Sequence, residues 1–219
     1  MQRRAATVVG IITIAFVVVI GLAQAQPPGC RQSDFGLLCD TYLANITVAP
    51  PTPTPPPDLS TLVLQPSDVP SGFQVSRSEE VTNEEAAESY GDPVAALVAF
   101  QQQGRQSSWF VGYRGTATLV SDQVIRYLTI EGANAGFDYS VANELQQWPD
   151  YGGPLSESYG DRAVLYIREF MQGDIELVKF LFVIRQGSYV ALVQITGTSD
   201  FMDTDTARAY AFLATARLP

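Results

Sequence analysis

The sequence predicts an α+β domain, with an antiparallel sheet of about five to six strands covered by about three helices. One observation behind this prediction is the stretch 175–197, in which two apolar runs rich in β-branched and aromatic residues flank Gln186-Gly187. This pattern is typical of a β-hairpin with a two-residue turn. The other observation is the order of the periodic segments, which reads helix, two strands, helix, three strands, helix. Short connections make neighbouring strands antiparallel, and helices must cover the apolar faces of the sheet.

The first run of this hairpin is apolar on both of its faces. One face holds Val178, Phe180, Phe182 and Ile184, and the other holds Ile175, Leu177, Leu181 and Val183, with Lys179 among them. A strand that is apolar on both faces lies in the middle of a covered sheet. The hairpin is therefore predicted to form the core of the domain.

The elements before the hairpin follow from their boundary signals. Asp92-Pro93 is typical of a helix start, with an N-cap residue followed by proline at the first helical position, and Gly104 fits the end of that helix. Residues 108–114 and 118–130 alternate as two strands do, joined by a tight turn at Gly115-Thr116.

The remaining elements are one more helix, a loop, a strand and a closing helix. The helix is predicted over 133–148, and Pro149 ends it. A polar loop follows at 149–161, then a strand at 162–171 that leads into the hairpin. Asp203 or the residue after it is expected to cap the last helix, on which Ala207, Tyr210, Ala211, Ala214 and Leu218 are expected to face inwards.

Four segments are predicted along the chain, because the composition changes at each boundary. An uncharged leader comes first, followed by a short segment with both cysteines, a stretch in which six of nine residues are proline, and the folded domain. The proline run favours a semi-rigid polyproline II spacer. The segments are 1–25, a signal anchor or transmembrane helix; 26–48, a cysteine-containing juxtamembrane segment; 49–57, a proline-rich linker; and 58–219, an extracytoplasmic α+β domain.

The leader is long enough to cross a membrane. Residues 5–25 carry no charge and follow Arg3-Arg4, which places the N-terminus in the cytoplasm and the rest of the chain outside. Ala23-Gln24-Ala25 is also a cleavage pattern, so the alternative is a secreted protein cleaved before Gln26. The predicted location is the cell membrane, with a single pass and an extracytoplasmic C-terminal domain.

Cys30 and Cys39 are the only two cysteines in the chain. In an oxidising compartment they are expected to form a disulfide that closes a loop of about ten residues. Lipidation is the alternative that the sequence leaves open. A metal site needs more ligands than these two residues supply.

Composition excludes several functions. The 219 residues include 13 basic and 23 acidic side chains, for a net charge of −10, so no nucleic-acid partner is expected. Histidine, the usual general base and the commonest metal ligand, is absent. We find no phosphate-binding loop, dinucleotide motif or hydrolase motif. No cofactor, no metal and no catalytic residue is therefore predicted.

Two acidic clusters have ordinary structural explanations. Asp200, Asp203 and Asp205 have the oxygen ligands that calcium prefers, but they stand where a helix N-terminus favours acidic residues. Residues 79–88 carry five glutamates and are expected to form a solvated loop or helix entry.

Lys179 is the only lysine, and it lies on an otherwise apolar strand. A desolvated lysine can act as a base. We expect instead that its stem packs on the sheet and that its amine reaches an acid such as Glu176 or Glu169.

Five aromatic residues are candidates for the lining of a groove that binds an apolar ligand. An aromatic core is the alternative for most of them. They are Trp109, Tyr113, Tyr127, Trp148 and Tyr151.

Short motifs in the domain resemble a family. The stretch Leu64-Gln65-Pro66-Ser67-Asp68-Val69-Pro70-Ser71-Gly72-Phe73, the stretch Tyr159-Gly160-Asp161-Arg162-Ala163 and the closing helix resemble uncharacterised anchored extracytoplasmic domains of Chloroflexi and actinobacteria. The resemblance covers about residues 64–218. It implies an extracytoplasmic location and an α+β fold loosely similar to the PsbP and Mog1 type, and it implies no catalytic residue.

These observations together predict a non-enzymatic, single-pass membrane protein. Residues 5–25 contact the membrane, and the domain is expected to contact protein partners as an accessory or structural subunit of a larger respiratory or photosynthetic complex. The alternative is an extracytoplasmic sensor or carrier domain for a small molecule or a lipid. A third hypothesis, an enzyme, would have to work through carboxylates such as Asp161 and Glu169.

Overall fold

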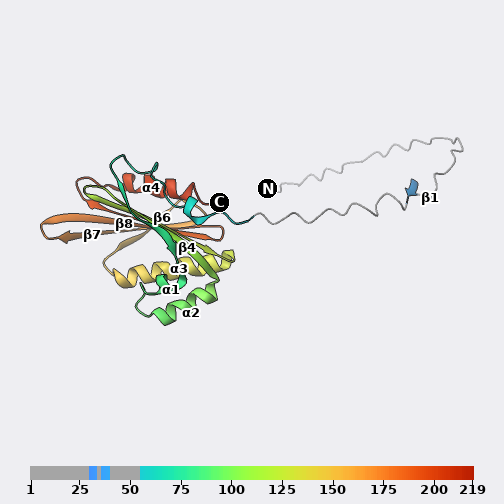
Figure 1. The fold of residues 1–219 in the computed structure, drawn as a ribbon, viewed down its shortest axis with the longest axis horizontal. Coiled ribbons are helices and arrows are strands. Elements are labelled where there is room, and N and C mark those ends of the chain that lie inside the picture. Colours follow the sequence, from blue (N-terminus) through green and yellow to red (C-terminus); the bar gives the residue numbers. More distant parts are fainter. Residues whose placement is uncertain (1–29, 34–35, 40–54) are drawn as a thin grey trace, which may run out of the picture. The chain divides into compact units, whose positions relative to one another are not determined.

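The computed structural model describes residues 30–33, 36–39 and 55–219, and Pro55–Pro219 form one compact unit. Its centre is a seven-stranded sheet in the order β3-β4-β5-β9-β8-β7-β6, with every neighbouring pair antiparallel (Figure 1). The strands are β3 (Gln74–Val81), β4 (Arg105–Arg114), β5 (Thr118–Tyr127), β6 (Gly152–Glu157), β7 (Arg162–Gln172), β8 (Ile175–Gln186) and β9 (Tyr189–Thr198).

Helices cover both faces of this sheet. On one face lie α4 (Thr204–Thr215) and a segment that begins with the short 3-10 helix η1 (Leu59–Thr61). On the other face lies α3 (Ile130–Gln147), with α1 (Asn83–Ala87) and α2 (Pro93–Gln103) beside it (Figure 1). We call these the α4 face and the α3 face.

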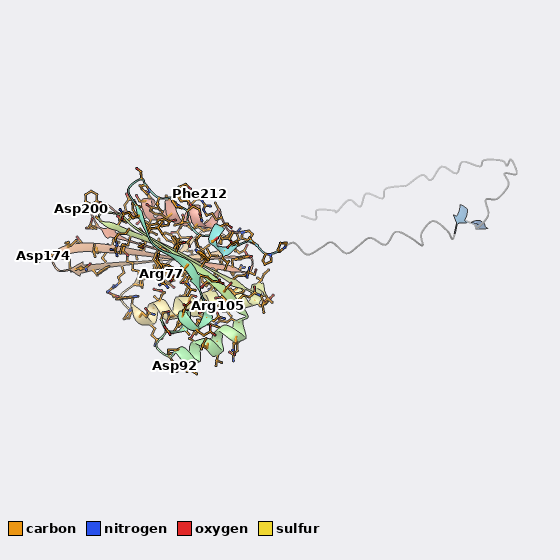
Figure 2. All side chains as sticks on the ribbon, viewed as in Figure 1. Arg77, Asp92, Arg105, Asp174, Asp200 and Phe212 are labelled. Atoms are coloured by element: carbon orange, nitrogen blue, oxygen red, sulfur yellow. The ribbon has the colours of Figure 1, made fainter. Side chains whose placement is uncertain are left out.

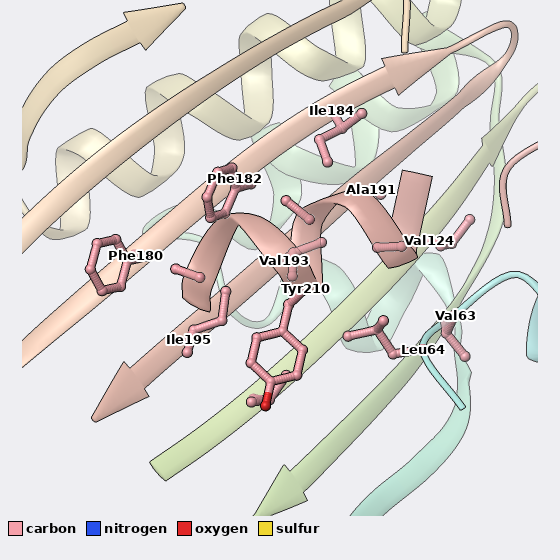
Figure 3. Close-up of a cluster of buried hydrophobic side chains, with 14 of the residues drawn as sticks. Val63, Leu64, Val124, Phe180, Phe182, Ile184, Ala191, Val193, Ile195 and Tyr210 are labelled. Atoms are coloured by element: carbon pink, nitrogen blue, oxygen red, sulfur yellow. The ribbon is translucent and has the colours of Figure 1, made fainter. Parts of the chain in front are cut away.

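The α4 face carries the largest hydrophobic cluster (Figure 3). Alternate residues of the central hairpin supply its middle, and α4 places Ala207, Tyr210, Ala211 and Ala214 against them. The strand residues include Phe180, Phe182, Ile184, Ala191, Val193 and Ile195, all nearly or fully buried. The predicted inward face of the closing helix is confirmed.

The α3 face carries two smaller clusters. Phe137 of α3 packs with Leu181, Val183 and Val190 of the central hairpin. A second cluster joins α1 and α2 to the edge of the sheet around Phe100. The central strand β8 is therefore buried on both faces, as its double apolar pattern predicted.

The predicted α+β class with an antiparallel sheet is confirmed, whereas the predicted strand count is too low. The compact unit Pro55–Pro219 has a sheet of seven strands and four α-helices. Five strands were expected correctly, and the two that were missed are the edge strands β3 and β6. β3 was not expected, and its last three residues fall in the acidic segment 79–88 that we expected to form a loop or helix entry; β6 lies inside the loop predicted at 149–161. Nearly every residue of both strands is exposed, so neither strand shows the apolar alternation that identifies a strand.

Helix ends agree well with their local signals. Asp92 caps α2 by accepting a hydrogen bond from the Ala95 amide at 3.0 Å, and Gly104 ends the helix in the left-handed conformation that glycine tolerates. Helix α3 begins three residues earlier than expected, because Thr129 caps it by accepting from the Gly132 amide. The turn of the central hairpin is also displaced by one residue: Gln186 pairs with Tyr189, so Gly187 forms the turn with the residue that follows it.

The segment with both cysteines contains a two-stranded antiparallel pair, β1 (Cys30–Ser33) and β2 (Gly36–Cys39). Its backbone register places Cys30 opposite Cys39. The predicted disulfide stays a prediction. If it forms, reduction will raise the intact mass of the chain by two hydrogen atoms, and a chain isolated without reductant will not react with a thiol reagent.

The predicted anchor at residues 5–25 lies outside the described residues. In the part of the chain that the structure describes, no helix has both the length and the apolar character needed to cross a membrane.

Candidate functional site

The β7–β8 hairpin extends beyond the C-terminal end of α3, so that part of the α3 face has no helix over it (Figure 1). Figure 2 shows Asp174 at the far tip of this hairpin. The uncovered surface is hollowed into an open groove of about 540 Å³, which we call the sheet groove. Its lining includes Phe110, Gly112, Arg114, Leu119, Ser121, Trp148, Arg168, Phe170, Lys179, Gln194 and Thr196.

A single row of side chains crosses the floor of the sheet groove. Cross-strand pairing sets Arg168 of β7 opposite Lys179 of β8, Lys179 opposite Thr196 of β9, Thr196 opposite Leu119 of β5, and Leu119 opposite Arg114 of β4. Neighbouring strands lie about 4.8 Å apart, so the row is about 19 Å long. Two adjacent cations therefore stand at one end of the row and a third cation at the other.

Arg168 is held in place by aromatic rings and a carboxylate. Its guanidinium lies 4.4 Å from the ring centroid of Trp148 and 4.6 Å from that of Phe170. Its Nε donates to both carboxylate oxygens of Asp150 at 2.8 Å. The side chain is thus fixed at the rim of the groove, which lowers the entropy lost when it binds a ligand.

Lys179 is half-buried beside Arg168. Its Nζ lies 5.5 Å from the ring centroid of Trp148 and 5.8 Å from that of Tyr151. Burial lowers the pKa of this amine, and the nearby Glu144 carboxylate opposes that shift. Among the residues that the structure describes, no carboxylate forms an ion pair with it. The predicted packing of its stem on the sheet fits this environment, but the acid whose charge acts on the amine is Glu144 and not the Glu176 or Glu169 that we expected.

Glu144 is the acidic residue behind this end of the groove. Gln194 Nε2 donates to its Oε1 at 3.1 Å, whereas its Oε2 is buried and has no hydrogen-bond partner among the described residues. Burial raises the pKa of this carboxyl, and the Lys179 charge and the Gln194 hydrogen bond act in the opposite direction. The hydroxyl of Tyr151 is likewise buried without a partner.

A second hollow of about 510 Å³ adjoins the first toward the tip of the hairpin. The two share Arg114, Leu119, Phe170 and Thr196, so they form one continuous surface. The second part is apolar, and Arg114 is its only charged residue. Its further lining includes Ala117, Ile175, Leu177 and Thr198.

The structure does not gather the five predicted aromatic residues into one groove. Trp109 packs against the α4-face core, and Tyr113 is buried in that core, where its hydroxyl donates to the Leu64 carbonyl at 2.8 Å. Tyr127 and Tyr151 are buried on the α3 face. Trp148 alone keeps a large part of its ring exposed, and it stands at the rim of the sheet groove.

Of the five predicted aromatic residues, Trp148 and the buried Tyr113 border the groove, and Lys179 was considered only as a possible base; the other groove residues were not anticipated. Arg168, Phe170, Leu119 and Thr196 come from three strands, and nothing in their local sequence distinguishes them. The one available signal was the alternation of side chains between the two faces of each strand, which places Arg168 and Lys179 on the face that turns toward α3. Their proximity depends on the register between β7 and β8, which the sequence does not state.

The carboxylates considered for catalysis do not form a pair. Asp161 accepts from Arg185 and from the Gly187 amide, both at 2.9 Å, and so braces the β8–β9 turn. Glu169 lies eight residues away along an extended strand, which is about 26 Å. These two residues cannot act on one substrate group.

The acidic clusters have structural roles. Asp203 caps α4 by accepting from the Thr206 amide at 2.7 Å. Thr82 and Glu85 form a reciprocal capping box at the start of α1, within the acidic segment. No group of three metal-ligating side chains occurs in the described ranges 30–33, 36–39 and 55–219.

Fold and groove together define an α+β domain with a partly uncovered antiparallel sheet that offers a binding surface.

No family model matches the sequence, and no match was found among curated proteins. Two solved structures are similar to the chain. One is the extracellular domain of PknH from Mycobacterium tuberculosis, with a TM-score of 0.45 and 12% identity over 73% of this chain and 94% of that chain. The other is a putative uncharacterized protein from Mycobacterium smegmatis, with a TM-score of 0.38 and 11% identity over 73% of this chain and 96% of that chain. Neither assigns a family or a function to this chain.

Proposed function

We propose that this chain is a single-pass membrane-anchored extracytoplasmic protein whose folded unit binds a small ligand in the sheet groove without transforming it. The observation that carries the proposal is the groove itself. It offers about 540 Å³ on the part of the α3 face that no helix covers, within the size range of small-molecule sites. Apolar and aromatic walls combined with a few fixed polar groups are typical of such sites.

The anchor is part of the proposal and rests on the leader. Residues 5–25 form an uncharged apolar stretch after Arg3-Arg4, and proline-rich residues separate it from the folded unit. The absence of histidine from the whole chain and the separation of Asp161 from Glu169 favour binding over catalysis.

A groove-filling variant tests the proposal. Thr196 lies in the middle of the cross-strand row, so Thr196→Trp is expected to occupy the groove. Ser156→Trp, on the exposed edge strand β6, adds the same side chain outside the lining and serves as the control. Circular dichroism establishes that both variants are folded.

The measurement is the unfolding temperature of the full chain against a panel of metabolites and lipids. A compound that binds only the folded state raises this temperature, and the rise increases with the ratio of its concentration to its Kd. We expect at least one compound to stabilise the native sequence and Ser156→Trp but not Thr196→Trp. If no compound stabilises the chain, or if every stabilising compound also stabilises Thr196→Trp, the proposal is wrong.

The accessory subunit of a larger membrane complex is the second candidate. Two exposed phenylalanines favour it: Phe201, just before α4, is 76% exposed, and Phe212 on α4 is 63% exposed (Figure 2). Large aromatic side chains are enriched where proteins contact each other. Gentle detergent extraction followed by mass spectrometry of the intact assembly tests this candidate. Protein partners that co-purify with the native sequence in a fixed ratio, and that no longer co-purify with Phe212→Ser, would support this candidate. A native chain that is extracted without partners would exclude it.

A further inference from the structure

The two ends of the sheet groove differ in chemistry. Arg168 and Lys179 stand side by side at one end, under the ring of Trp148. Toward the tip of the hairpin, Phe170, Leu177 and Ile175 form an apolar surface. We infer that the groove takes an amphipathic ligand with one anionic group, held at Arg168 and Lys179, and an unbranched apolar chain that extends toward Ile175. This inference rests on the proposed binding function of the groove.

Charge complementarity supports the anionic group. The lining contains three cations, Arg114, Arg168 and Lys179, and no carboxylate. Asp150 and Glu144 stand behind the cations and engage Arg168 and Gln194 respectively. Even with these two acids included, the surface has one net positive charge, in a chain whose net charge is −10.

The state of the two cations indicates which atoms would hold the anion. Asp150 occupies Nε of Arg168 and leaves the terminal nitrogens of the guanidinium without a carboxylate among the described residues. Among the described residues Lys179 forms no ion pair with a carboxylate, and its Nζ lies 5.5 and 5.8 Å from the ring centroids of Trp148 and Tyr151. An ammonium group and a guanidinium with free donors on adjacent strands form a site for a carboxylate or a phosphate.

The apolar end has room for a chain, and its side chains stay exposed among the residues that the structure describes. Leu119 is 49% exposed and Ile175 is 55% exposed, although both belong to strands of the sheet. From Lys179 to Ile175 along β8 the backbone spans about 13 Å, which suits a medium-length acyl chain. Burial of these side chains by such a chain would be favourable at about 25 cal/mol per Å² of apolar surface removed from water.

Trp148 provides a direct readout of the anionic end. The chain has two tryptophans, and Trp109 lies on the other face of the sheet. In a Trp109→Phe background, Trp148 is the only tryptophan. A ligand that covers its exposed ring will shift its emission to shorter wavelength.

The experiment uses the full chain with Trp109→Phe, reconstituted in vesicles of zwitterionic phosphatidylcholine. The probes are dodecanoate and dodecyl phosphate, each below its critical micelle concentration, and dodecan-1-ol below its solubility limit. All variants are compared in the same vesicles, so partitioning of a probe into the lipid is equal in each. The two anionic probes distinguish a fatty acid from a phosphate headgroup, and either supports the inference.

Two variants locate the anion. Lys179→Met removes the charge and keeps the apolar stem. Arg162→Met is the control, because Arg162 lies on β7, pairs with Asp138 and lines neither part of the groove. We expect an anionic probe to bind at least tenfold more tightly than dodecan-1-ol, and Lys179→Met to weaken its binding by about tenfold or more, as for the loss of a charge-assisted hydrogen bond. Arg162→Met should leave the affinity for the anionic probe unchanged, and neither variant should change the binding of dodecan-1-ol.

Equal affinity for the anionic and neutral probes would overturn the inference. So would a loss of anion binding that is equal in Lys179→Met and Arg162→Met. In both cases, if binding is also abolished by Thr196→Trp, the proposed function of the groove stands and only the ligand class is wrong. If none of the probes binds, the inference fails, and the compound panel with Thr196→Trp then decides the proposed function independently.

Discussion

Asp122 is a buried carboxyl whose replacement should change how the stability of the protein depends on pH. It lies on β5 within the α4-face core and is fully inaccessible to solvent. Its Oδ2 accepts a hydrogen bond from the Leu64 amide at 2.8 Å, and its Oδ1 has no partner among the described residues. Burial raises the pKa of this carboxyl to about 7 from its ordinary value of 3.8, against the opposing effects of the Leu64 hydrogen bond and the Arg217 charge.

The direction of the effect follows from linkage. The folded state holds the proton of Asp122 more tightly than the unfolded chain does. The stability from this group is therefore fully present below about pH 4 and is lost as the pH rises to about 7. A shift of about three pKa units corresponds to about 4 kcal/mol in the free energy of unfolding, as an upper limit.

Asp122→Asn removes this titration. The amide oxygen can still accept from the Leu64 amide, so the bond that holds the η1 segment to the sheet is kept. The NH₂ group takes the place of the unpartnered Oδ1, at a cost of about 1–3 kcal/mol that does not depend on pH. We therefore expect the stability of the variant relative to the native sequence to rise by up to about 4 kcal/mol between pH 4 and pH 8.

The assay is urea denaturation, followed by tryptophan fluorescence, at several pH values between 4 and 8. Asp174→Asn is the matched control, because Asp174 lies in the exposed β7–β8 turn and its replacement should change stability by less than about 0.5 kcal/mol at every pH. A constant difference between Asp122→Asn and the native sequence would refute the reasoning. A difference that favours the variant at low pH would refute it as well.

Two further predictions concern packing and an ion pair. Gly136→Ala should lower the free energy of unfolding by about 1–3 kcal/mol or more, because an added Cβ would lie 2.1 Å from the Tyr127 hydroxyl. The loss of stability is measured as a lower melting temperature in a thermal melt. A melting temperature equal to that of the native sequence would contradict this packing. Arg217→Ala should lower the free energy of unfolding by about 1.5–3 kcal/mol. The reason is that Arg217 donates two hydrogen bonds, from Nε and from a terminal nitrogen, to the two carboxylate oxygens of the half-buried Asp68, both at 2.8 Å. In a double-mutant cycle with Asp68→Ala, a coupling energy near zero would show that this pair contributes nothing.

The sequence predicted the elements whose boundaries and faces are encoded locally. The start and end of α2 follow from Asp92 and Gly104, because a cap satisfies backbone groups of its own helix. The inward face of α4 follows from the helical period alone. The double apolar pattern of β8 required a covered central strand, and the structure buries it on both faces.

The edge strands could not be predicted in the same way. β3 is exposed along all but its last residue, and it forms because its backbone pairs with β4, which supplies the hydrogen bonds that its side chains do not indicate. The same holds for β6 beside β7. Local composition instead favoured a loop at both places.

The sequence alone determined the class of fold, the central hairpin, the net charge of −10 and the absence of histidine. Only the tertiary structure decided which aromatic residues stay exposed. Tyr113 and Tyr127 are aromatic, as the residues that line a ligand groove often are. Tyr113 is nevertheless buried on the α4 face of the sheet, and Tyr127 is buried on the α3 face. The sheet groove likewise depends on strand order, because Arg168, Lys179, Thr196, Leu119 and Arg114 come from five strands and meet only through pairing. Burial and pairing are properties of the assembled sheet, and no stretch of sequence contains them by itself.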